Sequence, residues 1–178
     1  MVDTVLPGRT TARASLAEVT RTIGQIPDPE IPVVTLADLG ILRSVELAGE
    51  SIVVTLTPTY SGCPATESIA DDVNAALRAL GHADAQVLIT LSPAWSTDWM
   101  LPGTHEKLRA YGIAPPGQCG GPSGKTIQFH PLPDQLEPVC PRCSSPRVES
   151  LSEFGSTPCK ALYRCLSCAE PFDYFKPF

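Results

Sequence analysis

The sequence predicts a two-layer α/β domain with the element order α-β-β-α-β-α, followed by a small zinc-ribbon-like domain. Helix-like and strand-like runs alternate up to about residue 113, a Pro- and Gly-rich stretch follows, and two C-x-x-C pairs lie near the C-terminus. A chain of 178 residues suffices for one ordinary domain and a small satellite. We therefore expect a flexible tail at 1–14, an α/β domain at 15–113, a linker at 114–137 and the ribbon at 138–178.

The first helix is expected at about 16–26. Ser15 and Glu18 have the spacing of a capping box, in which each side chain bonds the other residue's backbone amide. Apolar residues then recur at helical spacing, at Leu16, Val19, Ile23 and Ile26. Prolines between 27 and 32 end this helix, because proline lacks the amide donor. Two β-rich runs at 41–47 and 51–57, with a short turn between them, predict a β-hairpin.

A second helix is expected at about 64–80, with Gly81 in the position that commonly follows a helix end. The run at 86–91 predicts a buried strand, which forms a right-handed β-α-β unit with 51–57. A last helix at about 103–111 ends at Gly112. In the ribbon, three short strands are expected at 147–154, 159–165 and 172–175.

The strongest motif is a set of four cysteines. Two C-x-x-C pairs, Cys140 with Cys143 and Cys165 with Cys168, are separated by a predicted hairpin that brings them together in a tetrahedral site with four sulfur ligands. About forty residues lack enough core to fold alone, so a structural zinc would supply the folding free energy. Iron or an iron–sulfur cluster stays open, because four thiolates bind these as well. Cys159 is either an extra ligand of this site or a small buried thiol.

A second candidate site lies at Cys63, at the expected start of the second helix. Pro64 suits the first helical turn, so Cys63 falls near the positive end of the helix, where a thiolate is favoured and its pKa is lowered. Two interpretations stay open: a buried structural cysteine, or a transient ligand of iron or an iron–sulfur cluster. The candidate loop residues of the same cofactor site are Asp28, Glu30, Thr59 and Thr66, of which the two acids also fit simple turn positions. No catalytic residue is predicted, since the three histidines fall in no motif.

The overall charge and hydropathy exclude two classes of partner. Thirteen basic against nineteen acidic residues give a net charge of −6 with no basic run, so we expect no nucleic-acid partner. No apolar run approaches the roughly 20 residues of a membrane span, and no signal peptide is apparent, so we expect no membrane partner and a cytoplasmic protein. Thiols stay reduced there, so seven cysteines indicate metal or thiolate chemistry rather than disulfides.

Several segments resemble known families. The iron–sulfur assembly domain of SufT-like and cytosolic cluster-targeting proteins is similar to segments 26–32, 38–40, 57–67 and 93–99. Two further segments, 152–165 and 170–176, resemble the PaaD family (also called PaaJ) of bacterial phenylacetyl-CoA epoxidase subunits.

This resemblance implies an accessory subunit of a multicomponent monooxygenase in aerobic phenylacetate catabolism, which assists assembly of iron or iron–sulfur centres. It also implies the oxygenase or reductase subunits of the epoxidase as partners, while homo-oligomerisation stays open. Two alternatives remain: a structural subunit of the oxygenase complex, and an electron-transfer protein with a cluster at the four cysteines.

Overall fold

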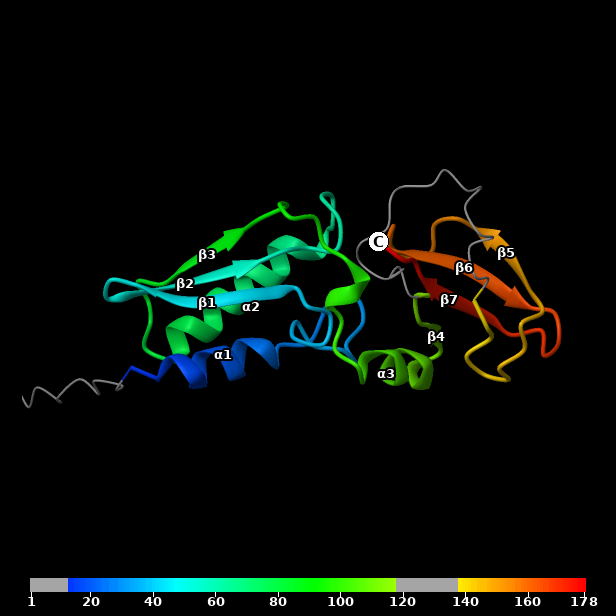
Figure 1. Ribbon diagram of the computed structural model, residues 1–178, viewed down its shortest axis with the longest axis horizontal. Coiled ribbons are helices and arrows are strands. Elements are labelled where there is room, and N and C mark those ends of the chain that lie inside the picture. Colours follow the sequence, from blue (N-terminus) through cyan, green and yellow to red (C-terminus); the bar gives the residue numbers. More distant parts are fainter. Residues whose placement is uncertain (1–12, 118–137) are drawn as a thin grey trace, which may run out of the picture.

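The computed structural model describes residues 13–117 and 138–178. Figure 1 shows two units lying end to end along the long axis, an α/β unit followed by an all-β unit. This confirms the predicted fold class. Residues 1–12 of the tail expected at 1–14, and residues 118–137 of the linker expected at 114–137, lie outside the described residues. Within the described part, no helix combines the length and the apolar character that crossing a membrane requires.

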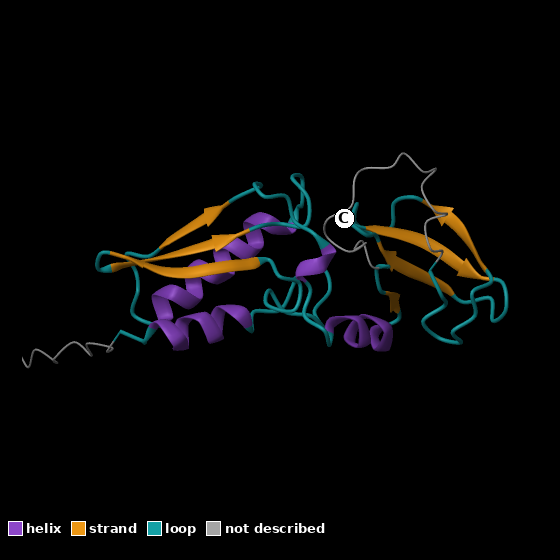
Figure 2. Cartoon of the chain, in the orientation of Figure 1, coloured by secondary structure: helices purple, strands orange, loops and turns teal. Residues whose placement is uncertain are grey.

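The first unit is a three-stranded sheet with two helices on one face (Figure 2). The strand order is β1-β2-β3, in which β1 and β2 form the predicted antiparallel hairpin and β3 runs parallel to β2. Its elements, in chain order, are α1 (Leu16–Gly24), β1 (Leu42–Ala48), β2 (Ser51–Leu56), α2 (Ala65–Ala79) and β3 (Gln86–Ile89).

The core of this unit lies between the sheet and its helices. Strand β2 alternates along its length, so Ile52, Val54 and Leu56 are buried while their neighbours are half-buried. The buried stripe of α1 includes Val19 and Ile23, and that of α2 includes Ile69, Val73 and Leu77. The capping box of α1 is confirmed: the Glu18 amide donates to Ser15 Oγ (3.3 Å) and the Ser15 amide donates to Glu18 Oε2 (2.8 Å).

Strand β3 differs from its prediction, because it is not buried. Leu88 and Ile89 are 49% and 43% exposed, and Leu91, just beyond the strand, is 52% exposed. Strand β3 lies at one edge of the sheet, and the helices cover only one face of that sheet. An apolar run therefore indicated the strand correctly but not its burial, since an edge strand can expose such residues.

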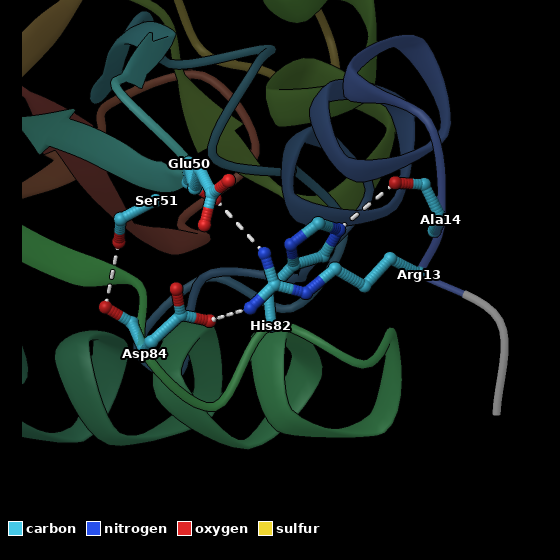
Figure 3. A network of polar contacts seen from close by, with 6 residues as sticks. All are labelled: Arg13, Ala14, Glu50, Ser51, His82 and Asp84. Atoms are coloured by element: carbon cyan, nitrogen blue, oxygen red, sulfur yellow. Dashed lines mark hydrogen bonds and ion pairs between the residues drawn. The ribbon is translucent and has the colours of Figure 1, made fainter. Parts of the chain in front are cut away.

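Figure 3 shows the contacts that fasten the start of the described chain to the turn before β3. The Arg13 guanidinium pairs with the Asp84 carboxylate and donates from Nη1 to the Glu50 carbonyl oxygen (2.9 Å). His82 Nε2 lies 2.8 Å from the Ala14 carbonyl oxygen. These bonds hold the residues just before α1 against the β1–β2 turn and the turn before β3.

A connecting segment carries the chain from β3 to the second unit. It contains a 3-10 turn (Thr97–Trp99) and helix α3 (Thr104–Tyr111), which ends at Gly112 in a left-handed conformation (φ +98°). The Asp38 carbonyl oxygen accepts hydrogen bonds from the Leu101 amide and the Thr104 hydroxyl, both at 2.9 Å. Gly40 is required beside it, because its φ is +68° and a Cβ there would lie 2.5 Å from the Trp99 carbonyl oxygen.

The second unit is a four-stranded sheet with the order β4-β7-β6-β5. Its elements are β4 (Ile113–Ala114), β5 (Val148–Ser152), β6 (Lys160–Cys165) and β7 (Pro171–Phe175). The last three are the predicted ribbon strands and pair antiparallel. The sequence did not predict β4, which follows α3 directly and pairs parallel with β7.

The two units share one apolar core at their joint. Phe175 and Cys159, both from the second unit, are 1% and 6% exposed and pack in the same cluster as the core of the first unit. The Thr97 amide also donates to the Phe178 carbonyl oxygen (3.2 Å). Burying a side chain such as that of Phe175 stabilises this joint by about 1.5 to 3 kcal/mol.

Candidate functional site

The four predicted cysteine ligands converge at one end of the second unit. The sulfur atoms of Cys140, Cys143, Cys165 and Cys168 all lie within 4.8 Å of one another. The Cys140 and Cys168 sulfurs are 3.7 Å apart, and those of Cys143 and Cys165 are 3.6 Å apart. A tetrahedral ion with metal–sulfur bonds of about 2.3 Å requires sulfur–sulfur edges of about 3.8 Å. The four thiols therefore fit a single metal ion.

Each C-x-x-C pair lies on a tight turn of the same form. The residue after each second cysteine has a left-handed backbone, with φ of 57° at Ser144 and 61° at Ala169. In the second turn the amides of Ser167 and Cys168 donate to the Cys165 sulfur, at 3.4 and 3.5 Å. Such amide bonds stabilise a thiolate, so the turns supply both geometry and charge compensation for a metal site.

The electrostatics of this site prepare one of its sulfurs for deprotonation before a metal is bound. The pKa of Cys165 falls to about 6, chiefly because the Cys168 amide donates to its sulfur, whereas burial and contacts with neighbouring cysteine sulfurs raise the pKa values of Cys143 and Cys168. Cys140 and Cys165 are buried, whereas Cys143 and Cys168 lie at the surface. A metal ion can therefore approach from the solvent side and displace the remaining thiol protons.

Cys159 is not part of this cluster. It precedes β6, while Cys165 ends that strand, and a strand of this length separates the two by roughly 20 Å. Its sulfur lies 3.0 Å from the Thr157 hydroxyl oxygen, and its side chain is buried. The prediction of Cys159 as an extra ligand of the four-cysteine site does not fit this placement, whereas its alternative as a small buried thiol does.

Cys63 lies just before α2, with Pro64 at the helix cap, and is half-buried. The sequence predicted a lowered pKa, but the structure gives the opposite direction. Burial raises the pKa of the Cys63 thiol, and the carboxylates of Asp28 and Glu30 raise it further. Hydrogen bonds from the Ala65 amide and the Thr66 hydroxyl act against them but are outweighed. In the absence of a metal, the thiol is therefore the favoured form.

Most of the predicted loop residues meet around Cys63. A small cavity of about 20 Å³ is lined by Asp28, Glu30, Thr59 and Cys63. Thr66 does not line this cavity, but its hydroxyl bonds the Cys63 sulfur. Three lining residues come from the second unit, namely Thr157, Cys159 and Phe175. No local sequence pattern connects these residues with Cys63, because they lie about a hundred residues away along the chain.

Asp28 combines a structural role with free ligand capacity. Its Oδ1 accepts the amides of Glu30 and Ile31, at 2.9 and 2.8 Å, which is the turn role that the sequence suggested. No described residue donates a hydrogen bond to its other oxygen, Oδ2. Burial raises the pKa of this carboxyl group. A cation in the cavity would compensate for that burial.

Two hydroxyl groups on the loop that carries Cys63 also lack partners. Thr57 Oγ1 and Tyr60 Oη are buried and make no hydrogen bond within the described part of the chain. Buried polar groups are normally bonded, so two unpaired hydroxyl groups on the loop that carries Cys63 call for an explanation, and a bound ligand would be one. The donor set, sulfur with oxygen, fits iron or zinc better than magnesium or calcium.

Comparison with family models agrees with this division into two sites. Residues 16–89 match the model described as "Iron-sulfur cluster assembly protein". Residues 127–176 match the model described as "PaaD zinc beta ribbon domain". The chain thus carries an iron–sulfur assembly domain with Cys63 and a zinc ribbon with a four-cysteine metal-binding site.

Comparison with individual proteins covers nearly the whole chain. A protein of Escherichia coli (strain K12), named as the D subunit of a "Putative 1,2-phenylacetyl-CoA epoxidase", is 50% identical over 94% of this chain and 96% of its own length. A "Fe-S protein maturation auxiliary factor" of Porphyromonas gingivalis (strain ATCC BAA-308 / W83) is 33% identical over 47% of this chain and 80% of its own length. A solved domain of unknown function from Bacillus anthracis has 27% identity and a TM-score of 0.47, covering 52% of this chain and 89% of that domain.

Proposed function

The chain belongs to the PaaD family of 1,2-phenylacetyl-CoA epoxidase subunits, and on this premise we propose that it is an accessory maturation subunit of such an epoxidase. In this role it assists assembly of iron or iron–sulfur centres in the oxygenase or reductase subunits during phenylacetate catabolism. The maturation factors that match its first half support the role. Reduced thiols in both units suit the cytoplasm, which is where we place it.

The observation that carries the proposal is the position of Cys63. Its thiol is half-buried in a cavity with the Asp28 and Glu30 carboxylates and is not committed to the four-cysteine site. A raised thiol pKa means that the metal must compete with a proton, which weakens binding near neutral pH. Weak, reversible binding is what a carrier needs, since the iron or cluster is cargo to be passed on.

The four-cysteine site has a different role in this proposal. The mutual distances of its sulfurs support a single ion, because thiolates bound to different irons of a cluster stand farther apart than thiolates on one ion. Its ligand set is complete, which is typical of structural zinc and leaves no open position for chemistry. We therefore assign zinc to the fold of the ribbon, and the ribbon to docking of the client subunit.

The test is maturation of the epoxidase by a Cys63→Ala variant. In cells that lack the native chain, we expect this variant to lower epoxidase activity, and the iron content of the purified oxygenase and reductase subunits, by about tenfold or more. A Ser61→Ala variant changes the same loop at an exposed side chain and serves as the matched control. Full maturation by a Cys63→Ala chain present at normal abundance would refute the carrier role.

A second candidate, a structural subunit of the oxygenase complex, is favoured by the edge strand β3. Its outer edge pairs with no other described strand, and Leu88, Ile89 and Leu91 are exposed along it. Such an apolar edge suits a permanent contact. If this is the function, Leu88→Asp abolishes co-purification with the oxygenase subunits, whereas Cys63→Ala leaves both the complex and its activity intact.

A further inference from the structure

The small cavity at Cys63 is shared between the two units. From the first unit come Asp28, Glu30, Thr59 and Cys63, and from the second come Thr157, Cys159 and Phe175. At about 20 Å³ it has room for a single ion or water molecule. Neither cysteine is in a disulfide. The joint between the units therefore brings two free thiols from distant parts of the chain to one enclosed space.

We propose that Cys63 and Cys159 are two thiolate ligands of one interdomain metal site, with Asp28 Oδ2 as the third ligand and a divalent ion of the Fe²⁺ or Zn²⁺ class as its occupant. The proposal rests on the proposed function, which by itself gives the cargo to Cys63 alone. Two sulfurs and one carboxylate oxygen form a donor set that these borderline ions accept. Three protein ligands leave one coordination position for a group of the client.

The surroundings of Cys159 prepare its sulfur for this role. The Thr157 hydroxyl lies 3.0 Å from that sulfur and can donate a hydrogen bond to the thiolate. Lys160, the next residue, is buried, with its ammonium group 3.6 Å from Asp173 Oδ2. Its charge lowers the pKa values of both Cys159 and Asp28, although burial raises both overall. One buried cation thus acts on ligands from both units.

The two sulfurs also act on a common neighbour. Burial is the largest cause that raises the pKa of Tyr60, and the charges on Cys63 and on Cys159 raise it further. The Tyr60 hydroxyl thus responds to the charge of both sulfurs, and it is buried without a partner in the described part of the chain.

Binding of a divalent ion at this site exchanges protons for metal and requires no redox step. A divalent ion that binds both cysteines displaces one proton from each thiol, and the two protons pass to solvent. Among the described residues, only the four-cysteine set has three or more ligand atoms within 4.8 Å of one another. Closing Cys63, Cys159 and Asp28 on an ion therefore requires side-chain rotation or a small approach of the two units. This makes occupancy of the cavity sensitive to how the ribbon is docked.

Anaerobic titration with Co²⁺ tests the site, using full-length protein whose ribbon is already loaded with zinc. The wild type should bind one further Co²⁺ and develop thiolate-to-cobalt charge-transfer absorption. In Cys159→Ser the absorption per bound ion should fall by about half, because one of two sulfurs is lost, and the affinity should fall by about tenfold or more. Leu151→Ala, an exposed change in the same unit, should bind as the wild type does.

A second variant keeps the test valid if Cys159→Ser fails to fold. Asp28→Asn keeps an Oδ1 acceptor for the Glu30 and Ile31 amides but removes the charge, so it should weaken Co²⁺ binding and leave the charge-transfer intensity of the bound form unchanged. Wild-type binding by both Cys159→Ser and Asp28→Asn would overturn the interdomain site. If Cys63→Ser lost Co²⁺ binding while Cys159→Ser and Asp28→Asn kept it, the proposed function would stand without the interdomain site. Absence of a further Co²⁺ in the wild type would also overturn the site.

Discussion

The ring of Trp95 lies 6.1 Å from the ring of Phe175, tilted by 57°, and this pair joins the two units. Trp95 is 5% exposed, and its indole nitrogen donates to the Leu39 carbonyl oxygen (2.9 Å). Trp95 is therefore a core residue. It links the loop before β1 with the end of β7.

Phe175→Ala should loosen this joint. Removing a large side chain that is 1% exposed leaves a cavity, and we expect the free energy of unfolding to fall by about 3 to 5 kcal/mol. Denaturation in guanidinium measures the loss, and a red shift of tryptophan emission would report water at Trp95. Phe178→Ala is the matched control, because Phe178 also contacts Trp95 but is 39% exposed. Equal losses in both variants would contradict the central position of Phe175.

Local sequence signals predicted most of the elements. The capping box at Ser15 and Glu18, the hairpin and the two C-x-x-C turns each depend on residues a few positions apart, so their structures follow from spacing. The four cysteines come together as expected because a single hairpin, formed by β5 and β6, connects the two pairs.

What the sequence did not predict depends on contacts between distant segments. Cys159 lines the Cys63 cavity because the two units dock, and no local pattern encodes that arrangement. The pKa of Cys63 was expected to fall from its place at a helix start, but burial and two carboxylates from another loop reverse the direction. The exposure of β3 likewise depends on which face of the sheet the helices cover.

Removal of the ribbon metal should unfold the second unit alone. Binding of a structural zinc supplies about 10 kcal/mol or more, which exceeds what a sheet this small can gain from its own core. After treatment with a chelator, or in Cys168→Ser, we expect amide hydrogen exchange to become fast in β5, β6 and β7 while α1 and α2 stay protected. Cys159→Ser should retain the ribbon metal, because Cys159 lies outside the four-cysteine cluster. A protected ribbon in metal-free protein would contradict the structural role.

Glycine at the two left-handed turn positions should stabilise the ribbon. Ser144 and Ala169 have φ of 57° and 61°, a conformation that costs side-chain-bearing residues about 1 to 2 kcal/mol. Glycine removes this strain but makes the unfolded chain more flexible, so Ser144→Gly and Ala169→Gly should each gain about 0.5 to 1 kcal/mol. The melting temperature of the zinc-loaded protein measures the effect. Gly112→Ala, at φ +98°, tests the same rule and should lower that temperature. Unchanged melting in both glycine variants would argue against strain in the turns.

The ion pair of Asp38 and Lys107 should make stability depend on pH. Burial acts to raise the pKa of Asp38, but Lys107 Nζ at 2.6 Å and bonds from Thr35 outweigh it, so the folded pKa lies below its usual range. A carboxyl group with a lowered folded pKa contributes stability above its unfolded pKa of about 4 and loses it as the pH falls through the folded value.

Lys107→Met should therefore be less stable than the wild type at pH 7, by about 1 kcal/mol or less because the lysine is half exposed. The difference should shrink as the pH falls below 4, since protonated Asp38 no longer gains from the lysine. Guanidinium denaturation from pH 7 to pH 3 measures it. Arg109→Met removes a charge of the same sign from the same helix without breaking an observed ion pair, and its effect should not vary with pH in this window. A Lys107→Met deficit that persisted at pH 3 would assign the loss to packing of the lysine stem instead of the ion pair.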